Sequence, residues 1–136
     1  MDYFFCRLPI LCYRLLVDMI MQRSGLLRES SVGGTIKDID YAGSHPLTGR
    51  YYYAQAKSRT TPKEARKYLN TFAQMNLDNP GAMYMYFLND DSATYESLTL
   101  EYQQKYDDFE YQIYGAREVG ELAAKLGLLD WVLDRT

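Results

Sequence analysis

The chain has 136 residues, of which 47% are hydrophobic and 24% are charged, as expected of one folded domain spanning 1–136. Its 15 basic and 18 acidic side chains give a formal net charge of -3, which excludes a protein that coats nucleic acid through overall positive charge. Two cysteines, Cys6 and Cys12, without zinc-ligand spacing exclude a disulfide scaffold and a zinc finger, and favour a reducing, cytoplasmic setting.

The first feature along the chain is an apolar segment over residues 3–22. Leucines and methionines recur there at three- and four-residue steps, which predicts a helix, with Pro9 as an early boundary or kink. Arg7, Arg14 and Asp18 interrupt the segment, so no uncharged stretch approaches the ~20 residues that a membrane span needs. We therefore expect no signal peptide and no membrane anchor.

A β-hairpin is predicted next. After a short strand over 26–28, alternating residues indicate one strand at 37–42 and another at 50–58. The loop between them, 43–49, contains turn-forming residues, and its His45 is better explained by a turn than by catalysis. The two longer strands should pair antiparallel.

The second half of the chain alternates helices with strands. Thr61-Pro62-Lys63-Glu64 is a capping box, which predicts a helix running to about Met75. After a turn at 79–81, the apolar run 82–88 is typical of a strand buried on both faces. A helix capped by 89–92 and ending near 107, a strand at 109–114, a helix at 115–126 and a last helical turn or packed tail at 128–133 complete the order. This order predicts an α/β fold, with a mixed central sheet of four to five strands flanked by helices.

Candidate chemistry lies on the predicted hairpin. Side chains alternate along a strand, so Asp38 shares a face with Asp40, and Gln55 shares a face with Lys57. We expect the two pairs to meet at one end of the sheet. Mg²⁺ prefers carboxylate and carbonyl oxygens, which Asp40, Gln55 and the backbone carbonyl of Ala56 would supply. Lys57 would position the attacking water and offset negative charge in the transition state.

These residues resemble the PD-(D/E)xK nuclease superfamily, which includes restriction endonucleases and archaeal-type Holliday junction resolvases. Fourteen residues separate Asp40 from the Gln55-Ala56-Lys57 segment, whose Gln is similar to the Mrr-type branch. The resemblance spans roughly 3–126 and implies a restriction-endonuclease-like fold and DNA cleavage dependent on Mg²⁺ or Mn²⁺. It implies that Asp40 is the main metal ligand, Gln55 the second and Lys57 the catalytic lysine, with Asp38 as a supporting acid.

The family often places a Glu on its first helix, facing the metal. Asp18 is the only acidic residue of the predicted helix 3–22 and is the candidate for that position.

Basic residues gather on and around the second predicted helix. Residues 1–85 contain eleven Lys and Arg against seven Asp and Glu, whereas 86–136 contain four against eleven. The residues expected to contact DNA phosphates are Arg59, Lys63, Arg66 and Lys67. The alternative for this patch is a solvated helix face.

The leading hypothesis is a Mg²⁺-dependent DNA endonuclease, acting as a homodimer through its apolar first helix so that both strands are cut. One alternative is a non-enzymatic factor, such as an inhibitor or an immunity-like protein, that binds another protein through its acidic C-terminal half. Another is a degenerate nuclease fold that binds nucleic acid without cutting it. Phosphate binding weakens steeply with added salt, which separates protein binding from the other two.

Overall fold

The computed structural model describes residues 8–29, 39–57, 60–89, 95–106 and 108–135. Two elements precede the hairpin, α1 (Ile10–Arg23) and β1 (Leu27–Arg28). The elements that follow are β2 (Tyr41–Ser44), β3 (Tyr51–Lys57), α3 (Pro62–Asp78), β4 (Met83–Leu88), α4 (Glu96–Lys105), β5 (Glu110–Tyr114), α5 (Ala116–Lys125) and α6 (Leu129–Leu133).

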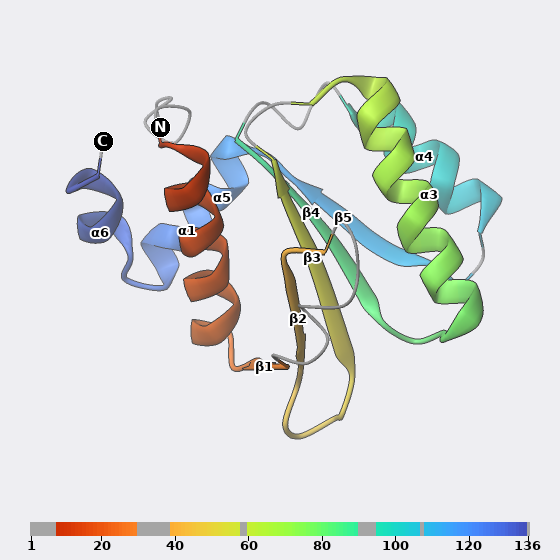
Figure 1. The fold of residues 1–136 in the computed structure, drawn as a ribbon, viewed down its shortest axis with the longest axis horizontal. Coiled ribbons are helices and arrows are strands. Elements are labelled where there is room, and N and C mark those ends of the chain that lie inside the picture. Colours follow the sequence, from red (N-terminus) through yellow and green to blue (C-terminus); the bar gives the residue numbers. More distant parts are fainter. Residues whose placement is uncertain (1–7, 30–38, 58–59, 90–94, 107, 136) are drawn as a thin grey trace.

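Within the described ranges, the strands form one five-stranded sheet in the order β1-β2-β3-β4-β5. β1, β2 and β3 pair antiparallel, whereas β3, β4 and β5 pair parallel, with α3 and α4 as the connecting helices. Figure 1 shows α1, α5 and α6 on one side of the sheet and α3 and α4 on the other. The predicted α/β fold with a mixed central sheet flanked by helices is confirmed.

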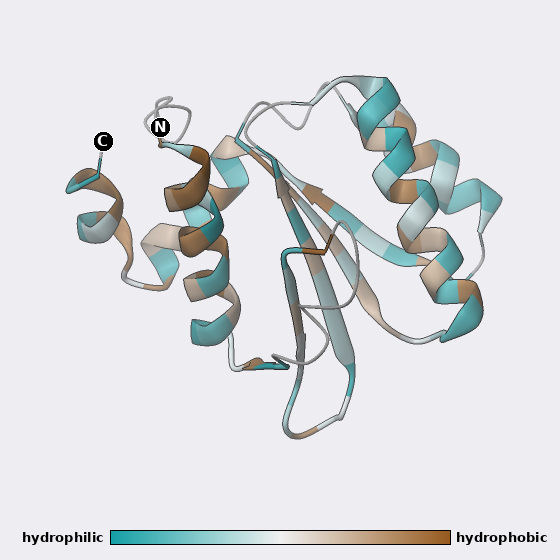
Figure 2. Cartoon of the chain, viewed as in Figure 1, coloured by the Kyte–Doolittle hydropathy of each residue, from teal (hydrophilic) through white to brown (hydrophobic). Residues whose placement is uncertain are grey.

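Side-chain alternation along β4 divides the interior into two cores. Met85 and Phe87 pack with α1 and α5, while Tyr84, Tyr86 and Leu88 pack with α3 and α4. All five are buried, with at most 6% of each residue exposed, as expected for a central strand covered on both faces. In Figure 2 hydrophobic colour covers much of α1, whereas α3 carries many hydrophilic residues. Each of these helices nevertheless buries one face: Tyr13, Leu16, Val17, Ile20 and Met21 are the buried residues of α1, and α3 buries the face that carries Leu69 and Phe72.

The boundaries of three predicted helices differ from the observed ones. The helix predicted to be capped by 89–92 and to end near 107 is α4, which runs from Glu96 to Lys105 with Tyr95 as its N-cap. The predicted helix 3–22 starts at Ile10 within the described chain, because Pro9 occupies the N-cap with an extended ψ of 151°. Residues 3–7 lie outside the described residues. α3 continues three residues past the predicted end at Met75, and the buried Asn76 in this added turn donates a hydrogen bond to the carbonyl of Asp108.

The first hairpin strand lies further along the chain than predicted. The expected strand 37–42 and loop 43–49 were wrong in their boundary, because β2 includes Gly43 and Ser44 and leaves out 39 and 40. Gly43 is needed inside this strand, since a Cβ there would lie 2.5 Å from Tyr41 Oη and 2.8 Å from the carbonyl oxygen of Leu27. The missing side chain lets β1 pair closely with β2.

In the part of the chain that the structure describes, no helix is both long enough and apolar enough to cross a membrane.

Candidate active site

Asp40 precedes β2 at a point where the pairing with β3 changes register. The ladder pairs Tyr41 with Ala54, so its continuation would set Asp40 opposite Gln55. Instead, the backbone N–H of Asp40 donates to the carbonyl of Ala54 at 2.9 Å, which is a slip of one residue. Because a one-residue slip moves a side chain to the other face of a sheet, Asp40 joins Tyr41 on the α1 side.

The Asp40 carboxylate takes the place of a backbone acceptor. Its Oδ2 accepts a hydrogen bond from the backbone N–H of Ala56 at 2.9 Å. The carbonyl of Lys57 accepts from Asn89, beyond the end of β4. Since successive carbonyls of a strand point to opposite sides, the carbonyl of Ala56 points away from β4, toward the side on which Asp40 lies. Asp40 and the Ala56 backbone are therefore neighbours at this edge.

A cavity of about 510 Å³ lies between α1 and this edge of the sheet. It holds two acidic and two basic side chains, Asp18 and Arg14 from α1, Arg28 from β1, and Asp40. The rest of its lining consists of Leu11, Leu15, Val17, Tyr41 and Ala56. Four segments that are separated in the sequence thus contribute charged groups or backbone to one space.

Each carboxylate in the cavity has a guanidinium partner. Arg28 Nη1 donates to Asp18 Oδ1 at 2.5 Å, and Arg14 Nε lies 3.7 Å from Asp40 Oδ2. All four side chains are partly exposed, from 25% to 41%, so solvent screens both pairs. The formal charge of the four groups sums to zero.

Tyr41 forms part of the wall behind these pairs. The Arg28 guanidinium lies over its ring, 5.4 Å from the centroid. Burial raises the pKa of the Tyr41 phenol, the Asp18 carboxylate raises it further, and Arg28 opposes the shift. Among the described residues, Tyr41 Oη has no hydrogen-bond partner.

Gln55 and Lys57 lie on the other face of β3. Lys57 Nζ is 5.1 Å from the ring centroid of Tyr68 on α3. Gln55 alternates with Ala54 and Ala56 of the α1 side, is 3% exposed, and its Oε1 has no hydrogen-bond partner in the described structure. The register slip therefore divides the sequence-predicted set, with Asp40 facing α1 and Gln55 and Lys57 facing α3. The predicted supporting acid, Asp38, lies outside the described residues.

The donors around the cavity suit a hard divalent cation. Asp18, Asp40 and the Ala56 carbonyl are oxygen ligands of the kind that Mg²⁺ and Mn²⁺ take, with water filling the remaining positions. Across the described ranges, no three His, Cys, Asp or Glu side chains gather as a metal-binding group. Metal binding here would therefore use two carboxylates and a backbone oxygen rather than a cage of side chains.

The sequence pattern did not single out Arg14 and Arg28 as functional residues. A signal for Arg14 exists, because it lies four residues before Asp18 and so shares its helix face. For Arg28 there is no such local signal, since its position depends on the pairing of β1 with β2.

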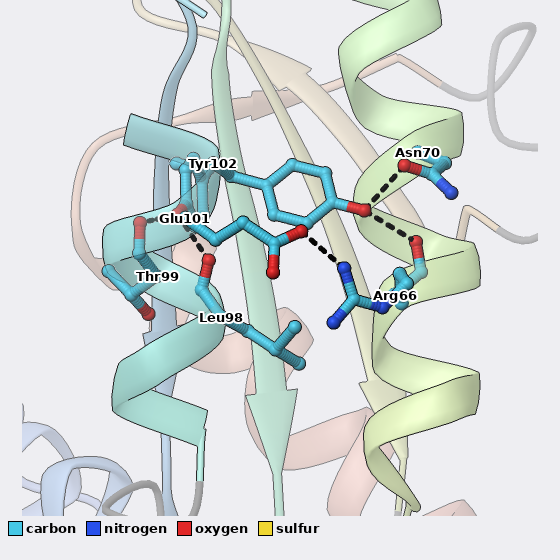
Figure 3. A network of polar contacts seen from close by, with 7 residues as sticks. Arg66, Asn70, Leu98, Thr99, Glu101 and Tyr102 are labelled. Carbon is cyan, nitrogen blue, oxygen red and sulfur yellow. Dashed lines mark hydrogen bonds and ion pairs between the residues drawn. The ribbon is translucent and has the colours of Figure 1, made fainter. Parts of the chain in front are cut away.

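The predicted phosphate contacts lie along the outward face of α3. Lys63, Arg66 and Lys67 lie on an open surface of this helix, which also carries Glu64 and Asp78. Arg66 forms an ion pair with Glu101 of α4, and Tyr102 donates hydrogen bonds to Asn70 and to the carbonyl of Arg66 (Figure 3). Arg66 is thus partly neutralised. The fourth predicted contact, Arg59, lies outside the described residues.

No protein-family model, curated protein or solved structure matches the chain. The resemblance to PD-(D/E)xK nucleases therefore rests on the residues and topology of the chain itself.

Proposed function

We propose that this chain is a metal-dependent DNA endonuclease that hydrolyses phosphodiester bonds in the cavity between α1 and the sheet edge. The observation that carries the proposal is the meeting of Asp18, Asp40 and the Ala56 backbone around one cavity. α1, the start of β2 and the end of β3 are the places where the resemblance expects metal ligands. The antiparallel hairpin followed by a parallel β3-α3-β4 crossover supports the same assignment.

In the proposed site, Asp18, Asp40 and the Ala56 carbonyl hold Mg²⁺ or Mn²⁺. Such a cation would supply Lewis acidity at the phosphodiester and would make a nearby water more acidic. The roles of Gln55 as a ligand and of Lys57 in orienting water are part of the nuclease hypothesis, but their side chains face α3 in this conformation. We therefore assign the cation first to the groups on the α1 side.

Two surfaces support further parts of the proposal. Lys63, Arg66 and Lys67 offer positive charge along α3 for backbone phosphates of DNA. On α1, Leu11 is 68% exposed and Leu15 is 55% exposed, which gives a homodimer an apolar contact close to the cavity. A cytoplasmic location belongs to the same proposal, because DNA and a reducing milieu are found there.

A degenerate fold that binds DNA without cutting it is the second candidate. The observation in its favour is that both cavity carboxylates are already paired with arginines. Binding without cleavage would then depend on the cations of α3 alone. The third hypothesis, binding of another protein, is retained as an outcome of the same experiment.

The test is incubation of the protein with supercoiled, linear, branched and single-stranded DNA, in the presence of Mg²⁺, Mn²⁺ or EDTA. We expect metal-dependent cleavage that is lost in Asp40→Asn and Asp18→Asn. Asp134→Asn, at the exposed residue that follows the end of α6, is the matched control for loss of one carboxylate. Lys57→Ala measures the contribution of the lysine that the family resemblance names.

Absence of cleavage on every substrate, with salt-sensitive DNA binding retained, would replace the endonuclease by the degenerate fold. Absence of both cleavage and DNA binding would leave protein binding as the function to pursue. Cleavage that survives in both cavity variants would place the reaction elsewhere on the molecule.

A further inference from the structure

The cavity contains two guanidinium groups that the endonuclease hypothesis has not used. Arg14 projects from α1 and Arg28 from β1, and both line the cavity with Asp18 and Asp40. A guanidinium has the planar donor geometry that matches the oxygens of a phosphate. The site thus holds the groups for a cation and those for a phosphodiester in one place.

In the free protein these groups satisfy one another. Arg28 is hydrogen-bonded to Asp18, and Arg14 stands 3.7 Å from Asp40. A divalent cation at Asp18 and Asp40 would therefore meet two positive charges, and a phosphate at the arginines would meet two negative ones. Either ligand alone must overcome the loss of the internal pairs.

Little free energy is needed to separate the two ion pairs, Arg14 with Asp40 and Arg28 with Asp18, when a ligand binds. All four side chains are partly exposed, and exposed ion pairs contribute little to stability. Two other contacts keep the Arg28 guanidinium in place when it leaves Asp18. It lies over the Tyr41 ring, and its Nη2 is 3.4 Å from the carbonyl oxygen of Asp40. Its charge therefore stays beside the cavity.

We propose that Arg14 and Arg28 bind the phosphate of the substrate, and that phosphate and divalent cation bind this site cooperatively because each releases the groups that the other needs. The inference rests on the proposed function, since it takes Asp18 and Asp40 as cation ligands. In the free protein Arg28 and Arg14 act as internal counter-ions. With substrate bound they turn to its phosphate, and Asp18 and Asp40 become available as ligands. By linkage, the gain in affinity is the same in both directions.

The experiment measures Mn²⁺ affinity from the free-ion signal in electron paramagnetic resonance. The probe phosphodiester is the dinucleotide TpT, added at increasing concentration. We expect TpT to tighten Mn²⁺ binding to the wild-type protein about fivefold or more. Arg28→Gln and Arg14→Gln should each tighten Mn²⁺ binding in the absence of TpT and reduce the effect of TpT.

Two further variants make the result specific. Arg28→Lys keeps the positive charge beside Asp18 but loses the planar fork, so it should bind Mn²⁺ as the wild type does and respond less to TpT. Arg117→Gln removes an arginine from an exposed ion pair on α5 and should change neither value. Circular dichroism checks that each variant is folded.

The outcomes separate the two hypotheses. Mn²⁺ binding that depends on Asp40 but is the same with and without TpT, and in both glutamine variants, would overturn the inference and leave the metal site in place. Failure of the wild type and of every variant to bind Mn²⁺ would overturn the metal site and the inference together.

Discussion

The carboxylate of Asp40 accepts a hydrogen bond from the backbone N–H of Ala56 at 2.9 Å, so that one side chain both extends the sheet and lines the candidate active site. The two roles call for different parts of the carboxylate. The sheet contact needs an acceptor oxygen, whereas cation binding needs negative charge. Substitutions that keep one and remove the other separate structure from chemistry.

Asp40→Asn should remove cleavage while leaving the protein nearly as stable as the wild type, because an amide oxygen can still accept from Ala56. Asp40→Ala leaves that N–H without its partner and should lower the free energy of unfolding by about 1–3 kcal/mol. Urea denaturation of both variants checks the difference. Equal stability of the two variants would show that the hydrogen bond contributes nothing to the fold.

The basic residues on the outward face of α3 predict a salt-sensitive interaction with DNA. The double variant Lys63→Gln and Lys67→Gln should bind duplex DNA more weakly and reduce the slope of log K against log salt by about 0.9 for each DNA phosphate that is no longer neutralised. Fluorescence anisotropy over a range of salt concentrations measures the slope. Lys125→Gln, in the last turn of α5, is the control and should leave the slope unchanged.

Thr61 caps α3, since its Oγ1 accepts from the backbone N–H of Glu64 at 3.2 Å. Thr61→Ala should therefore lower the free energy of unfolding by about 1 kcal/mol. Thr71→Ala, on the same helix, removes no cap and should change stability by no more than about 0.5 kcal/mol. A loss in the Thr71 variant as large as that at Thr61 would argue against capping as the cause.

Gln55 is buried, and its Oε1 has no hydrogen-bond partner among the described residues. Gln55→Leu replaces the amide by an apolar group of similar size, so the free energy of unfolding should stay constant or rise by about 1 kcal/mol. Thermal and urea unfolding measure it. A clear loss of stability would show that the amide is satisfied in solution.

Buried tyrosines predict a loss of stability at alkaline pH. Burial raises the pKa of Tyr111 to about 12, from 10.0, and also raises the pKa values of Tyr84 and Tyr86. Above pH 10 the unfolded chain releases phenol protons that the folded chain retains, so the free energy of unfolding falls as pH rises. The stabilisation that comes from the raised pKa of Tyr111 is fully present below pH 10 and is lost by about pH 12.

Urea unfolding at a series of alkaline pH values measures this loss. The variant Tyr84→Phe keeps the ring, which stacks on Tyr53 and lies tilted against Phe72, but removes one phenol hydroxyl. It should lose stability less steeply than the wild type. Identical slopes for the two proteins would assign the alkaline loss to other groups.

Local chemistry determined most of the secondary structure. The Thr61-Pro62-Lys63-Glu64 start signal, the alternation along residues 109–114 and the apolar run 82–88 depend only on neighbours in the sequence. The structure has α3, β5 and β4 at these places, with Thr61 as the N-cap of α3. The order of strands and helices predicted the mixed sheet, because two strands joined by a short loop pair antiparallel and two strands joined by a helix pair parallel. The shift of β2 was not predictable locally, because Gly43 belongs to the strand only when β1 lies against it.

The candidate site depended on the tertiary structure. The sequence placed Asp40, Gln55 and Lys57 on two adjacent strands, but the face of each side chain depends on the register of the pairing. A slip of one residue at Asp40 set it with Asp18, Arg14 and Arg28 and left Gln55 and Lys57 facing α3. Register comes from the packing of both sheet faces and from contacts between distant segments, and these are formed only when the chain has folded.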